Sequence, residues 1–135
     1  MEVAVDSELV ELLHGGGEPI NGFAKEIWEA EVEALLNFPD KPFCIVKGWR
    51  IIELDVDESY RDSLVNDGLA PYVLHAAEVV LHSSGKRCQG DWVRSTFQRS
   101  FTLGYLFEST NTVYVLLGRG VRKKGSVRAV MNIGR

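Results

Sequence analysis

The segment that follows Pro71 constrains the fold of this chain more than any other feature. It consists of short apolar runs separated by turn signals, and Thr112–Leu117 is its most strand-like run. Val, Thr and aromatic residues favour extended backbone, whereas Ser-Ser-Gly and Thr-Asn clusters favour turns. Short connections join antiparallel neighbours, so residues 72–117 are predicted to form an antiparallel meander of about four strands.

The first half of the chain shows helical periodicity instead. Residues 6–14 have leucines at the i, i+3, i+4 spacing of a helix, residues 22–37 carry an apolar stripe, and residues 58–66 fit a short helix. We expect Asn21 to cap the helix over 22–37 and Pro39 to follow its end. The stripe expected to be buried consists of Phe23, Ile27, Ala30, Ala34 and Phe38, widened by Trp28 and Leu35.

These patterns predict an α+β fold in a single domain spanning residues 1–135, which is a usual domain length. Its helical N-terminal half would pack on a small antiparallel β-meander or partly open barrel. Residues 1–68 would be mainly helical and acidic, and residues 69–135 mainly antiparallel β and basic. Residues 42–46 indicate a short buried strand, while residues 49–56 fit a strand or a helix almost equally well.

Charge is distributed unevenly along the chain. Residues 1–67 hold 16 Asp and Glu against 5 Lys and Arg, whereas residues 68–135 hold 3 against 10. Such asymmetry points to charged partners, or to two halves that attract each other within one fold. The candidate binding residues are the cations Arg94, Arg119, Arg122, Lys123, Lys124 and Arg128.

Most of these cations belong to the segment 119–128, which is predicted to be a glycine-rich basic loop. Gly120 and Gly125 have the spacing of a phosphate-binding loop, but Ser126 stands where that loop requires lysine. Only nine residues follow Ser126, too few for the further strand–helix units of such a fold, and residues 126–131 instead fit a closing helix with Ser126 as its cap. The segment is therefore either a solvated hairpin end or a surface that binds an acidic protein or a nucleic-acid backbone.

His75, Glu78 and His82 form the single cluster in the sequence that resembles a metal or acid–base site. On a helix the three side chains would share one face, whereas on a strand they scatter to different faces. The Val-Val-Leu run and the turn signal at residues 83–85 favour a strand. We therefore expect no metal, no cofactor and no catalytic residue, although a small metal-dependent enzyme stays an alternative.

Trp92 and Arg94 lie in a short alternating segment, and both residue types are frequent interface anchors. We expect Trp92 to belong to the core and Arg94 to be exposed. Cys44 and Cys88 stand outside any Cys-x-x-Cys pair and are expected to be free thiols of a cytoplasmic protein. The acidic start of the chain lacks the basic region of a secretory signal, and no apolar run is long enough to span a membrane.

The C-terminal half resembles a family of small, functionally uncharacterised bacterial proteins over roughly residues 71–118. The resemblance implies a bacterial or phage-borne source and no assigned reaction or ligand. The stretches that carry it are Gly85–Arg87, Gly90–Thr96, Phe107–Glu108 and Asn111–Gly118.

Taken together, these patterns favour a non-enzymatic protein-binding or regulatory module. Its partner would be a protein or a second copy of the chain, because charge separation is the most notable feature of the sequence. An alternative is a nucleic-acid-binding domain that uses residues 119–128. The remaining alternative is the small metal-dependent enzyme at His75, Glu78 and His82.

Overall fold

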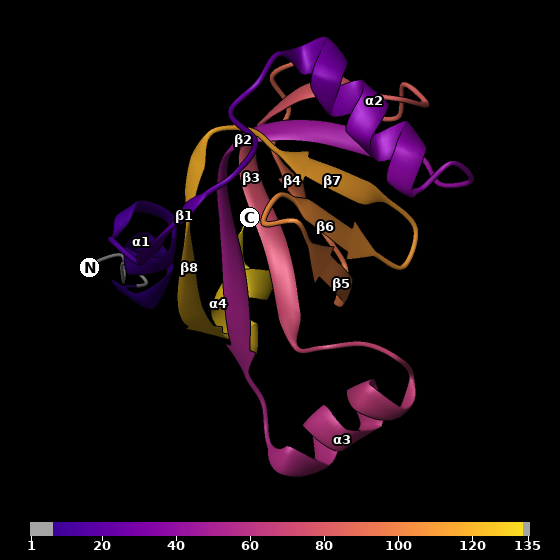
Figure 1. Ribbon diagram of the computed structural model, residues 1–135. Coiled ribbons are helices and arrows are strands. Elements are labelled where there is room, and N and C mark those ends of the chain that lie inside the picture. The colour runs from indigo at the N-terminus through magenta and orange to yellow at the C-terminus, as the bar shows by residue number, and fades with distance from the viewer. Residues whose placement is uncertain (1–6, 134–135) are drawn as a thin grey trace.

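The computed structural model describes residues 7–133 and shows a curled sheet with short helices around it (Figure 1). Its helices are α1 (Ser7–His14), α2 (Ile27–Asn37), α3 (Glu58–Asn66) and α4 (Val127–Met131). Its strands are β1 (Glu18–Asn21), β2 (Phe43–Asp55), β3 (Tyr72–His82), β4 (Val93–Arg94), β5 (Gln98–Thr102), β6 (Leu106–Ser109), β7 (Val113–Leu116) and β8 (Arg119–Ser126).

Strand β2 is the centre of the sheet, because it is paired along both of its edges. β3 runs antiparallel to it from Cys44 to Glu53. On the other edge, residues 43–46 pair in parallel with β7, and residues 50–55 pair in parallel with β8. Gly48 lies between these two parallel ladders with φ +63°, a conformation that favours glycine. The sheet is therefore mixed, and β2 changes its parallel partner across this glycine.

The sheet curls into a half-barrel. β5, β6 and β7 form an antiparallel meander, and an isolated bridge between Ala70 and Gln98 brings the start of β5 to the chain that enters β3. The inside is filled by an apolar cluster, which we call the interior core. Its buried members are Cys44, Val46, Trp49, Ile51, Leu74, Ala76, Val79, Val93, Phe107, Tyr114 and Leu116.

The helices cover parts of the outer side of the sheet. α2 packs through Ala30 and Ala34 onto a second cluster that includes Phe43 and Ile45 of β2. The short alanine side chains let the helix backbone approach the sheet closely. α1 and α4 cover a third cluster, in which Leu12 meets Ile52. α3 extends from the sheet on the connection between β2 and β3 (Figure 1).

The predicted helical N-terminal half on an antiparallel meander is wrong. Strands account for 43% of the described residues and helices for 26%, and the helices are small and scattered. The main reason is β2, which continues from the predicted strand at residues 42–46 through the ambiguous residues 49–56. The antiparallel prediction also fails, since β7 and β8 pair in parallel with β2. Chain-neighbour arguments cannot find such pairings, because they join segments far apart in sequence.

Several local predictions are confirmed. β3 covers the predicted strand at residues 72–82, and α3 covers the predicted helix at residues 58–66. Ser126 caps α4 by accepting a hydrogen bond from the Ala129 backbone N–H at 3.0 Å. Each of these elements has its own local signal, and the global topology does not oppose it.

The helix predicted over 22–37 begins later than expected. α2 starts at Ile27, and its cap residue is Glu26 rather than Asn21. The chain before it is extended, because the backbone N–H groups of Gly22 and Phe23 donate to the carbonyls of Gly118 and Leu116 at 2.8 and 2.7 Å. Tertiary hydrogen bonds therefore outweigh the helical pattern at this end.

The remaining predictions concern the location and organisation of the chain. Residues 7–133 contain no helix with the length and apolar character needed to cross a membrane. The acidic start of the chain and Asp6, the first residue of the predicted helix over 6–14, lie outside the described range. The single domain and the cytoplasmic location stay predictions.

Candidate functional site

The segment predicted to be a basic loop is the strand β8, so this prediction is wrong. β8 lies between β1 and β2 and pairs antiparallel with the first and in parallel with the second. Its glycines suit close packing rather than a loop: a Cβ on Gly120 would lie 2.3 Å from the Trp49 ring, and one on Gly125 would lie 3.0 Å from Leu12. Because side chains alternate along a strand, the cations of β8 point to opposite faces.

Lys123 holds the end of α1. Its Nζ donates to the backbone carbonyls of Glu11, Leu12 and Gly15 at 2.5, 2.9 and 2.9 Å. The last carbonyls of a helix lack partners within the helix and carry partial negative charge, which a cation satisfies. Burial lowers the pKa of Lys123, and the charge of Arg50 adds to that effect. Lys123 therefore has a structural role in this fold.

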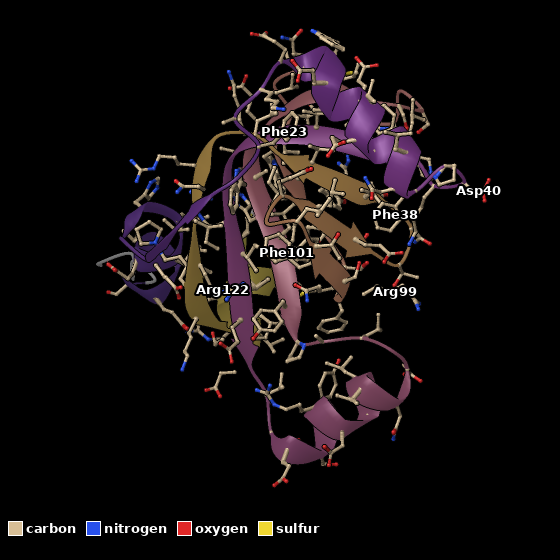
Figure 2. The ribbon with its side chains drawn as sticks, in the orientation of Figure 1. Phe23, Phe38, Asp40, Arg99, Phe101 and Arg122 are labelled. Carbon is tan, nitrogen blue, oxygen red and sulfur yellow. The ribbon has the colours of Figure 1, made fainter. Side chains whose placement is uncertain are left out.

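The other candidate cations lie apart from one another. Arg122 of β8, which is labelled in Figure 2, stacks on the Tyr72 ring, with its Cζ 5.8 Å from the ring centre. Arg128 forms an ion pair with Glu8 at 3.6 Å. Arg94 lies on a different strand, β4, and donates to the Val130 carbonyl of α4 at 2.9 Å. These four cations therefore do not form one basic surface, while Arg119 and Lys124 are exposed on β8.

Lys123→Met is expected to lower the free energy of unfolding by about 1–2 kcal/mol, because three helix-end carbonyls lose a charged donor. Lys124→Met removes an equal charge from the next residue, which is exposed, and should change stability by less than about 0.5 kcal/mol. Urea unfolding of both variants and the parent chain measures the difference. Equal stability of the two variants would contradict the capping role of Lys123.

The structure separates His75, Glu78 and His82. His75 contacts Arg50, Glu78 pairs with Lys47 at 3.3 Å, and His82 accepts a hydrogen bond from the Ser84 backbone N–H at 3.2 Å. No group of three possible metal ligands comes together among residues 7–133. The three side chains are separated because residues 72–82 form the predicted strand, β3. Cys44 is free and buried, and burial raises its thiol pKa to about 12, while Cys88 is free and exposed.

Trp92 is not a core residue, contrary to expectation. Its side chain is 44% exposed, while Val93 beside it is buried in the interior core. Alternation along β4 therefore points Trp92 and Arg94 to the outer face. There the Trp92 ring lies 5.9 Å from the ring of His75, which sequence reasoning did not connect with it.

The most distinctive surface is the outward face of α2. Trp28, Val32, Leu35 and Leu36 are all exposed, Trp28 by 65% and Leu36 by 73%. Their spacing of three and four residues puts them on one stripe, opposite the buried Ala30. We call these four residues the α2 stripe. The prediction that Trp28 and Leu35 widen the buried face is wrong, because α2 is apolar on both sides and the alanine side packs on the sheet.

A cleft of 590 Å³ runs beside the α2 stripe, between α2 and the turn that joins β5 to β6. Leu103 lies in that turn with φ +60° and is 63% exposed, so a large apolar side chain is held at the rim in a left-handed backbone conformation. Inside, the Tyr105 hydroxyl donates to Glu33 and its ring packs 4.9 Å from Phe23. Burial and the Glu33 hydrogen bond raise the pKa of Tyr105 to about 12.

Fold and surface together define a small half-barrel domain with an apolar helix face beside an open cleft. The model of the family described as "Domain of unknown function (DUF6957)" matches residues 21–132, and the chain belongs to that family. The match is wider than the resemblance over residues 71–118 and includes α2 and β2. It confirms a family without an assigned function, while a bacterial or phage origin stays a prediction. No curated protein and no solved structure matches the chain.

Proposed function

We propose that this protein is a protein-binding module, and that the α2 stripe and the cleft beside it hold a basic amphipathic segment of a partner protein. The observation that carries the proposal is the α2 stripe, a row of large apolar side chains turned to solvent on a helix whose inner face is already packed. Contiguous exposed apolar surface marks interaction sites on small domains. A helix that lies in an apolar groove is a common mode of such binding.

The charge around the stripe indicates the chemistry of the partner. Glu29 and Glu33 flank the stripe on the side of the cleft, and Glu31 flanks it on the other side. Among the described residues, Lys25 is the single cation that lines the cleft. An acidic rim around an apolar centre favours a partner that carries Lys or Arg beside its own apolar residues.

Leu103 supports the same reading. A non-glycine residue at positive φ costs of order 1 kcal/mol, and such strain concentrates at functional positions. Here it places an exposed leucine on the rim of the cleft, across from Trp28. Both side chains are suited to be anchors for an apolar segment, since large side chains that bury fully on binding dominate interface energies.

A different protein fits this surface better than a second copy of the chain. Three cations that could face the acidic rim of another copy have roles within their own copy: Lys123 of β8 caps α1, Arg122 of β8 stacks on Tyr72, and Arg128 of α4 pairs with Glu8. A free chain with its own basic amphipathic segment has no such internal competition.

A synthetic amphipathic helical peptide, with leucines on one face and lysines on the other, is expected to bind the protein, and Trp28→Ala should weaken binding about tenfold or more. The reason is the loss of the largest exposed apolar side chain of the stripe. Isothermal titration calorimetry measures both affinities. Because Trp28 is exposed, the substitution should leave the unfolding curve unchanged.

The matched control is Val65→Ala on α3, which trims another exposed apolar residue and should bind the peptide like the parent chain. A second peptide with glutamates in place of lysines should bind far more weakly. Equal binding of the two peptides, or equal loss in both variants, would overturn the proposal. A dimer in solution that Trp28→Ala converts to monomer would show that a second copy occupies the surface, and would also overturn it.

The proposal includes a cytoplasmic location and a bacterial or phage-borne source, supported by the composition and by the sequence resemblance. Nucleic-acid binding through residues 119–128 stays a prediction without a supporting surface, since the cations of β8 point to different faces and Arg128 lies on α4. The metal-dependent alternative likewise has no assembled ligand group among residues 7–133.

A further inference from the structure

Three neighbouring strands place three nitrogen-rich side chains in one row, on elements separate from α2. In the sheet register Arg50 of β2 is opposite His75 of β3, and His75 is opposite Arg94 of β4. Their chain neighbours Trp49, Leu74 and Val93 belong to the interior core, so the row faces the outer side of the sheet. The row contains Arg94, a candidate binding residue from the sequence, together with Arg50 and His75, which the sequence alone does not connect to it.

The hydrogen bonds of the row leave donors available. Arg50 donates through Nη1 to His75 Nδ1, and Arg94 donates through Nη1 to the Val130 carbonyl. A guanidinium group has five N–H donors, so most of those on Arg50 and Arg94 have no partner among residues 7–133. Both side chains are half-buried, and neither forms an ion pair with any residue in the range 7–133.

This arrangement concentrates positive charge, and no carboxylate of residues 7–133 lies within ion-pair distance of either arginine. Arginine stays protonated in proteins, so Arg50 and Arg94 each carry a full charge beside the buried His75. Burial, followed by these two guanidinium charges, lowers the pKa of His75 to about 4. A neutral imidazole can accept a hydrogen bond from Arg50 but cannot neutralise the charge of the guanidinium group. Half-buried like charges are costly unless an anion pairs with them.

Trp92 adds a second recognition element at the same place. Its ring lies 5.9 Å from that of His75, tilted by 33°, and 44% of the residue is exposed. A half-exposed indole beside the His75 ring offers a flat surface on which a ligand ring can stack. Arginine is also the residue best suited to fork-like hydrogen bonding of phosphate oxygens.

We propose that Arg50, His75 and Arg94 form a binding site for a phosphate group, with Trp92 as a stacking surface for a ring carried by the same ligand. The two guanidinium groups donate to the phosphate oxygens, and His75 orients Arg50 by accepting from it. The phosphate could be supplied as the free ion or as part of a mononucleotide. This site is independent of the α2 stripe and of the function proposed for it.

The test titrates inorganic phosphate, adenosine monophosphate and adenosine into the protein at fixed ionic strength, with calorimetry as the readout. Phosphate and the nucleotide are expected to bind, the nucleotide more tightly, and adenosine alone should bind much more weakly. Arg50→Met should weaken the binding of both anions at least about tenfold, since one forked contact and one charge are lost. Arg119→Met removes an exposed charge elsewhere and should leave both affinities unchanged.

Two further variants keep the outcome decisive. Arg50→Lys retains the charge and the fold, so weaker binding in it reports the loss of the fork rather than of stability. Trp92→Ala should lower the affinity for the nucleotide to about the affinity for free phosphate. The affinity for phosphate itself should not change. The proposal is overturned if neither anion binds, or if Arg119→Met lowers affinity as much as Arg50→Met. Equal affinity of phosphate and the nucleotide would overturn the stacking role of Trp92.

Discussion

Trp49→Ala is expected to lower the free energy of unfolding by about 3–5 kcal/mol, the range observed when a large buried aromatic residue is truncated. Trp49 is 2% exposed and is among the largest side chains of the interior core. Its Nε1 donates to the Leu117 carbonyl at 2.9 Å, so truncation also removes a hydrogen bond. The total free energy of unfolding of a domain of this size is about 5–15 kcal/mol, so the variant would be close to unfolding.

The loss cannot be relieved by local collapse, because the ring fills space left by a glycine. A Cβ on Gly120 would lie 2.3 Å from the indole, so that strand already approaches Trp49 as closely as its backbone allows. Urea unfolding measures the effect, with Trp28→Ala as the matched control because Trp28 is 65% exposed. We expect the control to change stability by less than about 0.5 kcal/mol. A cost below about 1 kcal/mol for Trp49→Ala would contradict the interior placement.

Lowering the pH from 7 to 4 is expected to destabilise the protein through His75 by about 3 kcal/mol. Burial and the charges of Arg50 and Arg94 hold the pKa of His75 at about 4, below its ordinary value of 6.5. Between these two values the unfolded chain binds a proton on His75 that the folded chain does not bind. Stability is therefore constant above the unfolded pKa and falls as the pH drops through this window.

His75→Gln isolates this effect, because glutamine keeps an acceptor for Arg50 but does not titrate. Urea unfolding at pH 7 and pH 4 should show a smaller loss of stability for the variant than for the parent chain. His14→Gln, at the exposed end of α1, should retain the loss of the parent. If His75→Gln and the parent lose equal stability, then His75 is not held neutral by its surroundings.

The local elements of this fold can be predicted from the sequence where a single signal decides them. Ser126 before an apolar run predicts a capped helix, and the run at residues 72–82 predicts a strand. The ambiguous residues 49–56 could not be assigned in the same way, because strand and helix patterns coincide there. Their strand conformation depends on pairing with β3 and β8, and single-sequence periodicity carries no information on such partners.

The proposed phosphate site and the α2 stripe were only partly predictable for a related reason. Arg94 was identified as a candidate, but its neighbours Arg50 and His75 come from two other strands and are brought together by the sheet register. The α2 stripe was missed because Trp28 and Leu35 fit a buried helix face in the sequence. Only the packing of Ala30 and Ala34 on the sheet shows that the small residues take the inner face.

The position of β2 has a consequence for how the chain folds. Residues 50–55 of β2 are completed on one edge by residues 121–126, so the central strand acquires that neighbour from nearly the opposite end of the chain. Such non-local pairing makes loop closure costly and slows folding, while the antiparallel contacts of β2 with β3 can form much earlier. During synthesis, β2 therefore exposes an open edge until residues 121–126 leave the ribosome, and a nascent β2–β3 hairpin with such an edge is prone to misassembly.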